Sequence, residues 1–188
     1  VYSFSLLLLC TFGIHRYYLS YLYSKKKHKV PVPKGNFTNL PIVTIQLPVY
    51  NEMYVVERLI SSVCEIDYPK DLLEIQVLDD STDKTTEIAL QCVDHFREKG
   101  FNISCLHRKD RDGYKAGALR EGLKSAKGEF IAIFDADFMP PKEFLRKTID
   151  FFVDSEVGMV QVRWGHVNQD YSTLTKCQSI LLDGHFII

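Results

Sequence analysis

The residues of this chain best suited to chemistry are two carboxylates one residue apart, Asp135 and Asp137. They follow the apolar run 130–134, so we expect them at the end of a buried strand. Residues i and i+2 of a strand share one face, which would bring both carboxylates to the same side. Hard oxygen ligands suit Mg²⁺ or Mn²⁺, and such a cation in turn holds a diphosphate. The pair predicts a metal site, with caps for the helix after Pro140 as the alternative.

A second pair of carboxylates, Asp79 and Asp80, follows the apolar run 73–78. Open α/β sheets bind ligands at the carboxyl ends of their strands, where both acidic pairs would meet. One carboxylate of this second pair could bind an imide N–H of a base or the hydroxyls of a ribose. Residues 81–83 could instead cap the following helix, although capping does not explain two adjacent acids. Two acidic strand ends on one edge indicate a nucleotide-sugar site.

The segment that joins the first predicted strand to the first helix contains Pro48, Tyr50 and Glu52. An aromatic ring and a carboxylate at this point could stack on a nucleobase and hydrogen-bond to it. A structural interpretation is equally open, in which Asn51 caps the helix and Tyr50 packs on the surface. We therefore treat the segment as a candidate for nucleoside binding.

Lys115 lies at the start of a later predicted helix, two residues after Gly113. Backbone N–H groups at a helix start attract phosphate, and the lysine would add a positive charge beside it. The segment is neither a Walker loop nor a dinucleotide fingerprint, so it does not support an ATPase or a dehydrogenase. Gly113 and Gly117 could equally serve close helix packing. Further along, Arg163 and Trp164 place a cation and the only tryptophan after a predicted strand, where the indole could stack on a sugar or enter the core.

Short apolar runs alternate with helical periodicity from residue 42 onward. We predict strands at 42–47, 73–78, 103–106, 130–134 and 157–162, separated by helices that begin near Val55, Ala89, Ala116 and Phe144. Pro48 is expected to end the first strand, because proline has no N–H to donate. Gly100 is expected to end the second helix. Such alternation is typical of βαβ units and of an α/β fold with a mainly parallel, doubly wound sheet.

The composition fits one globular domain, with 188 residues of which 46% are hydrophobic. A net charge of −1 leaves no electrostatic footprint for nucleic acid. The five cysteines are widely spaced without a Cys-x-x-Cys pair, so we expect reduced thiols in a cytosolic compartment rather than zinc or disulfides. The chain begins with Val1, and we interpret it as a fragment of a longer chain.

The N-terminal segment differs from the rest in composition. Residues 1–14 carry no charge, tyrosines follow, and lysines dominate 25–29. This order is typical of a membrane helix that leaves the bilayer on its cytoplasmic side, and a buried amphipathic helix is the alternative. We predict part of a transmembrane helix at 1–23, a basic, proline-containing linker at 24–40 and, from 41 to 188, the N-terminal part of an α/β domain, which would bind the nucleotide sugar. The protein would be an integral membrane protein with this domain in the cytoplasm, at a bacterial inner membrane or at the Golgi of a eukaryote.

Five segments in this order resemble the motifs of glycosyltransferase family 2, and the resemblance runs from about Leu40 to the end of the chain. They are Pro48–Glu52, Asp79–Ser81, Gly113–Leu119, Asp135–Asp137 and Val160–Trp164. Within the family the chain is most similar to the cellulose-synthase-like and glucomannan-synthase-like membrane branch. The resemblance implies a GT-A fold and sugar transfer with inversion.

The resemblance also implies roles for single residues. Those expected to bind the nucleotide sugar are Pro48, Tyr50, Glu52, Asp79, Asp80, Lys115 and Asp135. Asp135 and Asp137 would bind Mg²⁺ or Mn²⁺. The Thr-Glu-Asp motif that carries the family's catalytic base is absent, and Gln161–Trp164 has one residue too few for its Gln-x-x-Arg-Trp motif. Both would be expected beyond Ile188, so the fragment would hold the donor-binding part.

The expected reaction is metal-dependent transfer of a sugar from UDP-glucose or GDP-mannose to a growing β-glycan, with UDP-glucose ranked slightly ahead. The metal would stabilise the departing diphosphate as a Lewis acid. Three alternatives remain open at this point. The acceptor could be a lipid such as ceramide or polyprenyl phosphate, the chain could be a non-catalytic nucleotide-sugar-binding subunit, or it could be a Mg²⁺-dependent nucleotidyltransferase.

Overall fold

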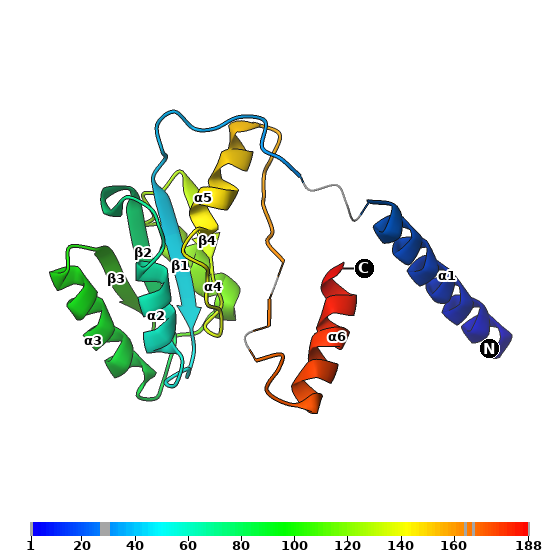
Figure 1. Cartoon of the computed structure of the whole chain (residues 1–188). Coiled ribbons are helices and arrows are strands. Elements are labelled where there is room, and N and C mark those ends of the chain that lie inside the picture. Colours follow the sequence, from blue (N-terminus) through cyan, green and yellow to red (C-terminus); the bar gives the residue numbers. More distant parts are fainter. Residues whose placement is uncertain (1, 27–30, 164, 167, 188) are drawn as a thin grey trace. The chain divides into compact units, whose positions relative to one another are not determined.

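The computed structural model describes residues 2–26, 31–163, 165–166 and 168–187, and it divides into two compact units (Figure 1). Residues 33–157 form one unit, and the described residues before 33 and after 157 form the other. Every residue predicted to bind a nucleotide sugar or a metal lies in the first unit. That unit is therefore the part of the chain that positions the candidate site.

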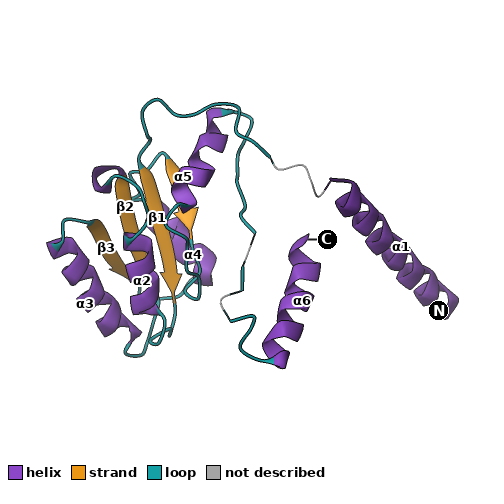
Figure 2. Cartoon of the chain, in the orientation of Figure 1, coloured by secondary structure: helices purple, strands orange, loops and turns teal. Residues whose placement is uncertain are grey.

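Four parallel strands form the sheet of this unit (Figure 2). They are β1 (Val43–Val49), β2 (Leu73–Asp79), β3 (Asn102–His107) and β4 (Phe130–Ile133). Their order across the sheet is β3-β2-β1-β4. The α/β class, the parallel sheet and four of the five predicted strands are confirmed, with ends that differ from the prediction by one or two residues.

Helices connect the strands, as the alternating pattern predicts. They are α2 (Val56–Cys64), the short 3-10 helix η1 (Lys70–Leu72), α3 (Thr85–Glu98), α4 (Tyr114–Leu123), α5 (Phe144–Thr148) and the 3-10 helix η2 (Ile149–Val153). Gly100 follows α3 with φ of 83°, a left-handed conformation that glycine adopts without a steric penalty. The expected end of this helix is confirmed.

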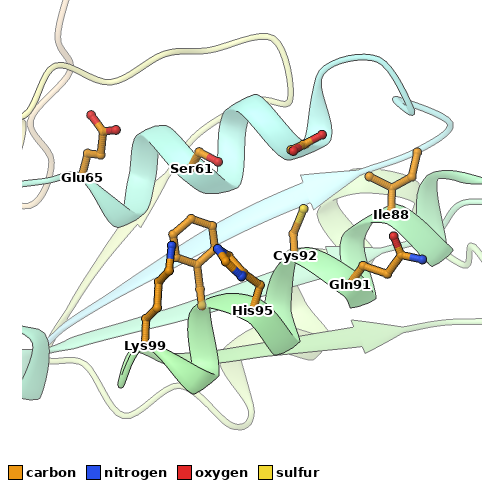
Figure 3. A pocket seen from close by; sticks show the side chains of 9 residues that line it. Ser61, Glu65, Ile88, Gln91, Cys92, His95 and Lys99 are labelled. Carbon is orange, nitrogen blue, oxygen red and sulfur yellow. The ribbon is translucent and has the colours of Figure 1, made fainter.

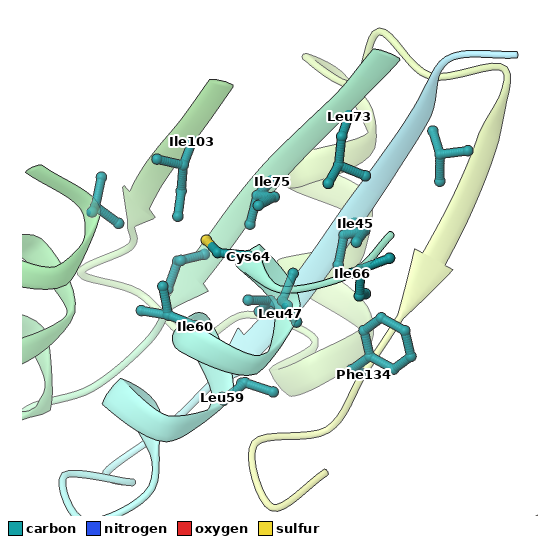
Figure 4. Packing of buried hydrophobic residues seen from close by; sticks show 14 of the residues in the cluster. Ile45, Leu47, Leu59, Ile60, Cys64, Ile66, Leu73, Ile75, Ile103 and Phe134 are labelled. Atoms are coloured by element: carbon teal, nitrogen blue, oxygen red, sulfur yellow. The ribbon is translucent and has the colours of Figure 1, made fainter. Parts of the chain in front are cut away.

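One face of the sheet is apolar and packs against α2 and α3 (Figure 4). Ile45 and Leu47 of β1 and Ile75 of β2 are fully buried beneath Leu59 and Ile60 of α2. Alternate strand residues meet apolar residues at helical spacing, which is the pattern that the sequence predicts. Burying one such side chain contributes about 1.5–3 kcal/mol.

The opposite face of the same strands is polar and lies under α4. Oγ1 of Thr44 donates to Oε2 of Glu74 at 2.6 Å, and Nε2 of Gln46 donates to Oε1 of Gln76 at 3.0 Å. Gly122 of α4 lies directly over this network, since a Cβ there would be 2.7 Å from Nε2 of Gln46. β1 and β2 are thus packed between an apolar layer formed with α2 and α3 and a polar layer beneath α4.

The prediction that Pro48 ends the first strand is wrong, because β1 continues to Val49. The carbonyl of Gln46 accepts from the N–H of Phe134 on the β4 side. Residues i and i+2 of a parallel strand face the same neighbour, so Pro48 also faces β4. The paired residues of β4 end at Ile133, opposite Gln46, and no β4 residue is paired with Pro48 in the described ladder. The missing N–H of proline therefore breaks no hydrogen bond of this ladder.

The predicted fifth strand at 157–162 is also wrong. The structure assigns these residues no strand, and each of them is exposed or only partly buried. Their apolar residues alternate as in a strand, but a strand needs a partner, and local pattern does not supply one. Residues 158–162 belong to the second unit, whereas all four strands of the sheet belong to the first.

The described residues of the second unit form two helices, α1 (Tyr2–Lys26) and α6 (Thr173–Ile187). A helix in the predicted N-terminal region is therefore confirmed, and none of its described residues is buried. Among the described residues, no helix combines the length and the apolar character that crossing a bilayer requires. Residues 31–40 contain neither helix nor strand, as their prolines predict.

Candidate functional site

The candidate residues meet at the carboxyl edge of the sheet. The chain runs from β1 to β2 to β3 on one side and then returns to place β4 on the other side of β1. The carboxyl ends of β1 and β4 therefore flank a topological switch point, where open α/β sheets bind ligands. Tyr50 follows β1 and Asp135 follows β4, so both lie next to this point. Asp80 and Arg108 follow β2 and β3 along the same edge.

Asn51 joins the first two loops of this edge. Its backbone N–H donates to Oγ of Ser81 at 2.9 Å, and its Oδ1 accepts from the N–H of Thr82 at 2.9 Å. Asn51 has φ of 54°, which asparagine tolerates better than most residues. The cap of α2 is Val55, so the interpretation of Asn51 as a helix cap is wrong. Its bonds instead fix the backbone beside Tyr50.

Asp79 is fully buried and both of its carboxylate oxygens are engaged. Oδ1 accepts from the N–H of Ser81 at 3.0 Å, and Oδ2 accepts from Oγ1 of Thr86 at 2.6 Å and lies 2.8 Å from Nδ1 of His107. Burial by itself would raise the pKa of Asp79, but the hydrogen bonds from Thr86, Ser81 and His107 outweigh it and lower the pKa. Direct nucleoside binding by Asp79 stays a prediction, and it would require some of these bonds to break.

Asp80 forms a two-pronged ion pair with Arg108. Nε of Arg108 donates to Oδ1 at 2.7 Å and Nη2 donates to Oδ2 at 2.5 Å, with only 4% of the Asp80 side chain exposed. The hydrogen bond to Asp80 raises the pKa of the Arg108 guanidinium. Arg108 also donates to the carbonyls of Asp112 and Tyr114, each at 3.1 Å. One arginine thus connects β2 to the loop that leads into α4.

The sequence reasoning assigned no role to Arg108, although a signal was present. Arg108 follows a predicted strand, as the two acidic pairs do, and so had to lie on the same edge. The N-cap of α3 is Lys84, so none of residues 81–83 is the cap that the alternative interpretation expected. Oδ1 of Asp83, one residue before the cap, accepts from the N–H of Thr85 at 2.9 Å.

The start of α4 depends on a close backbone approach. Gly113 and Tyr114 both have positive φ, 70° and 49°. The N–H of Gly117 donates to the carbonyl of Gly113 at 2.9 Å. A Cβ added to Gly117 would overlap the carbonyl oxygen of Asp112 and lie 2.9 Å from Nη1 of Arg108. The interpretation of Gly117 as a close-packing residue is therefore supported by the space around it.

Replacing Gly117 by alanine is expected to lower the free energy of unfolding by about 1–3 kcal/mol, because the methyl group has no room beside the Asp112 carbonyl. Urea unfolding of the intact protein measures this change. Gly35→Ala is the matched control, since a Cβ there meets only Cγ1 of Val153 at an ordinary 3.4 Å. Equal unfolding midpoints for the two variants would contradict the tight packing at Gly117.

Lys115, the second residue of α4, makes an ion pair with Asp135 across the switch point. Both side chains are partly exposed, 52% for the lysine and 40% for the aspartate. The structure places Asp135 two residues after the end of β4 and Asp137 in the turn that follows. The backbone N–H of Phe138 donates to the carbonyl of Asp135 at 3.0 Å and closes that turn. The expectation that both acids continue an extended strand is wrong.

The donor set at this point fits a divalent cation only in part. Asp135 and Asp137 offer hard carboxylate oxygens, but no group of three potential ligands occurs in the described part of the chain. Mg²⁺ commonly takes one or two carboxylates and completes its shell with water and substrate phosphates. The pair therefore fits a cation that arrives with a diphosphate. In this structure the carboxylate of Asp135 is paired with Lys115. An exposed ion pair of this kind contributes little free energy, so a cation can replace the lysine.

Tyr50 presents a partly exposed ring beside these charges. Its side chain is 40% exposed, and the guanidinium of Arg111 lies over the ring with Cζ 3.2 Å from the centroid. Glu52 is exposed, and its backbone carbonyl accepts from the N–H groups of Val55 and Val56 at the start of α2. The aromatic and acidic residues predicted to receive a nucleoside are thus on the same loop.

A surface hollow of about 620 Å³ lies between α2 and α3 (Figure 3). Helix residues line it, including Glu57, Ser61, Cys92 and His95. None of the candidate residues contributes to this hollow. Of the segment 161–164, Arg163 belongs to the second unit and Trp164 lies outside the described residues, so the sugar-stacking role of the indole stays a prediction.

Comparison with curated proteins gives relatives named as glucomannan 4-beta-mannosyltransferases. A glucomannan 4-beta-mannosyltransferase of Oryza sativa subsp. japonica is 43% identical over 162 residues, which are 83% of this chain and 31% of the relative. A glucomannan 4-beta-mannosyltransferase of Arabidopsis thaliana is 43% identical over 157 residues, which are 80% of this chain and 29% of the relative. The chain spans less than a third of the length of these relatives.

Solved structures share the fold. The mannosyltransferase PcManGT from Pyrobaculum calidifontis, in complex with GDP-Man and Mn²⁺, is 30% identical with a TM-score of 0.69, over 81% of this chain and 44% of that protein. S. aureus TarS 1-349 in complex with UDP is 28% identical with a TM-score of 0.53, over 65% of this chain and 38% of that 1-349 chain. Residues 44–186 match the family model of glycosyl transferase family 2. With the GT-A type of sheet, these matches show that the chain belongs to glycosyl transferase family 2.

Proposed function

We propose that the intact protein transfers mannose, with inversion, from GDP-mannose to a growing β-glycan. The observation that carries the proposal is the Lys115–Asp135 pair across the switch point, with the ring of Tyr50 on the neighbouring loop. The names of the curated relatives and the GDP-Man complex of PcManGT support mannose as the sugar. On this support we rank GDP-mannose first and UDP-glucose second, the reverse of the order that we expected from the sequence.

Each candidate residue has a task that follows from its position. Tyr50 offers its ring to the guanine base, and base–aromatic stacking contributes about 1–3 kcal/mol. Lys115 supplies a positive charge to the diphosphate at the start of α4. Asp135 and Asp137 would hold Mn²⁺ or Mg²⁺, which when bound would stabilise the negative charge of the departing diphosphate. With Asp135 engaged in this way, Lys115 would be free of its ion pair and could donate to phosphate oxygens.

A separate proposal concerns the N-terminal segment 1–29 and the membrane. We propose that the intact protein is anchored in a membrane with this domain on the cytoplasmic side. The uncharged residues 1–14 and the lysines that follow at 25–29 support it. Protease protection of the intact protein in sealed vesicles tests it, since digestion of the domain from the cytoplasmic side is the expected result.

The proposed reaction predicts a dependence on both donor and metal. The intact protein with Mn²⁺ and β-mannan oligosaccharides is expected to incorporate mannose from GDP-mannose and to release GDP. Chelation by EDTA is expected to lower the rate by about 10²–10³-fold, because the metal contributes several kcal/mol of charge stabilisation. Added Mn²⁺ should restore it. Product analysis by radiolabel and by chromatography of the released nucleotide measures both effects.

The same assay separates the competing functions. Incorporation from UDP-glucose alone would overturn the choice of donor, and transfer that survives EDTA would overturn the metal. Release of pyrophosphate would indicate a nucleotidyltransferase. Nucleotide binding without any transfer would indicate a binding subunit, and transfer to ceramide or polyprenyl phosphate in place of glycan would change the acceptor class.

A further inference from the structure

We propose that Arg111 is a phosphate-responsive gate on Tyr50. In this structure the guanidinium covers the ring, and a nucleoside diphosphate draws the guanidinium onto its phosphates and thereby uncovers the ring for the base. This inference rests on the proposed function, because it assumes that a nucleotide sugar binds at the carboxyl edge of the sheet. It adds a nucleotide-binding residue that neither the sequence reasoning nor the family resemblance assigned.

The position of Arg111 puts it in competition with a base. Its Cζ lies 3.2 Å from the centroid of the Tyr50 ring and 5.3 Å from the centroid of the Tyr114 ring. Tyr50 directly follows β1, and the backbone N–H of the next residue, Asn51, donates to Oγ of Ser81. The backbone of Tyr50 therefore has little freedom to move the ring away from Arg111. A base that stacks on this face of Tyr50 must take the place of the guanidinium.

The contacts that hold Arg111 are weak for a charged side chain. Its Nε is buried and has no hydrogen-bond partner among the described residues. The nearest carboxylate oxygen, Oδ2 of Asp80, is 3.9 Å away, beyond hydrogen-bond distance. Both oxygens of Asp80 are already bonded to Arg108 at 2.7 and 2.5 Å. The carboxylate of Asp80 is therefore neutralised by Arg108, and Arg111 lies beside it without a hydrogen bond to it.

A diphosphate offers Arg111 what the protein does not. Phosphate oxygens accept two parallel hydrogen bonds from a guanidinium, and such charge-assisted pairs are stronger than a cation over a ring. The backbone does not need to move, because the carbonyl of Arg111 accepts from the N–H of Tyr114 at 2.8 Å and anchors the loop. Lys115, three residues after the loop's Asp112, brings a second cation to the same place. The release of Arg111 from Tyr50 and its binding to phosphate are therefore one side-chain movement.

This exchange predicts effects of opposite sign on two ligands. For guanosine, which has no phosphate, Arg111 is only a competitor for Tyr50, so Arg111→Ala is expected to tighten binding about two- to fivefold. For GDP, Arg111 is also a ligand, and the same variant is expected to weaken binding about 10- to 100-fold. A residue with a merely structural role would change both affinities in the same direction.

The test is a comparison of dissociation constants for guanosine and GDP, each with Mn²⁺, on the intact protein. NMR titration suits the weak nucleoside, and calorimetry suits GDP. Arg111→Lys keeps the charge without the planar fork, and it is expected to bind GDP with an affinity between those of wild type and Arg111→Ala. Arg146→Ala is the matched control, because Arg146 of α5 pairs with Asp67 and its replacement should leave both constants unchanged. Circular dichroism confirms that each variant is folded.

The outcomes distinguish this inference from the proposed function. A wild type that binds neither GDP nor UDP overturns the proposed function and the gate with it. A wild type that binds GDP, with Arg111→Ala weakening guanosine and GDP equally or changing neither, overturns the gate and leaves the proposed function standing. If Arg111→Ala is unfolded, the sign of the effect in Arg111→Lys decides in the same way.

Discussion

Replacing Asp135 by asparagine is expected to lower sugar transfer by the intact protein at least about 10²–10³-fold while leaving its stability nearly unchanged. The amide removes one of two carboxylates at the switch point, and with it the negative charge that a divalent cation needs. The fold should tolerate the change, because the Asp135 side chain is 40% exposed and its ion pair with Lys115 is a surface pair.

Two measurements separate the metal role from a simple charge effect. The transfer rate as a function of Mn²⁺ concentration should shift to higher concentrations in Asp135→Asn, and in Asp137→Asn as well. Asp94→Asn is the matched control, because Asp94 forms an exposed pair with Arg97 on α3 and is 67% exposed. Its transfer rate and its Mn²⁺ dependence should equal those of the wild type.

Lys115→Met provides the complementary variant. If the only task of Asp135 were to hold Lys115, removing either partner would have the same effect on transfer, and neither would alter the response to Mn²⁺. Under the metal assignment, Lys115→Met instead weakens binding of the nucleoside diphosphate and keeps the Mn²⁺ response. An Asp135→Asn protein with wild-type Mn²⁺ dependence would contradict the assignment of this carboxylate as a metal ligand.

The strands and helices of the unit 33–157 could be predicted from sequence because local pattern determines them. The apolar run 73–78 is a strand, and apolar residues at helical spacing place Leu59 and Ile60 of α2 on the core. Two predictions failed because they depended on partners. The strand β1 passes through Pro48 since β4 ends before that residue, and 157–162 has no strand to pair with among the described residues.

The location of the candidate site could also be predicted, since parallel strands bring their carboxyl ends to one edge. The partners of the acids could not. His107 faces Asp79 because the register of β2 and β3 places these two residues opposite each other, and no local pattern gives that register. Arg108 reaches Asp80 across 28 residues of sequence for the same reason. The sequence therefore identified charged residues at the edge but not which of them neutralise one another.

The pairs at this edge differ in what they do. The Lys115–Asp135 pair is exposed, so it can exchange for a cation and a diphosphate at little cost. The Arg108–Asp80 pair is buried, with 15% and 4% of the side chains exposed, and it also fixes the carbonyls that shape the start of α4. The first pair fits a ligand-binding role and the second a structural one. Their different burial predicts different responses to mutation.

Arg108→Ala is expected to lower the free energy of unfolding by about 3–5 kcal/mol, because it leaves the buried carboxylate of Asp80 without its partner. It also removes the donors to the carbonyls of Asp112 and Tyr114. Urea unfolding of the intact protein, followed by circular dichroism, measures the loss. Arg120→Ala is the matched control, since Arg120 is 68% exposed in its pair with Asp112 and should change the midpoint little.

A double-mutant cycle then identifies the cause. If Arg108→Ala loses stability because the carboxylate of Asp80 is left buried without a partner, adding Asp80→Ala should recover part of the free energy of unfolding. The coupling free energy between the two sites should then be about 0.5–3 kcal/mol. If the cost comes from the lost carbonyl bonds, the second change will recover nothing. An Arg108→Ala protein as stable as Arg120→Ala would show that the pair does not hold the loop. In that case Arg108, like Arg111, would be available to bind phosphate.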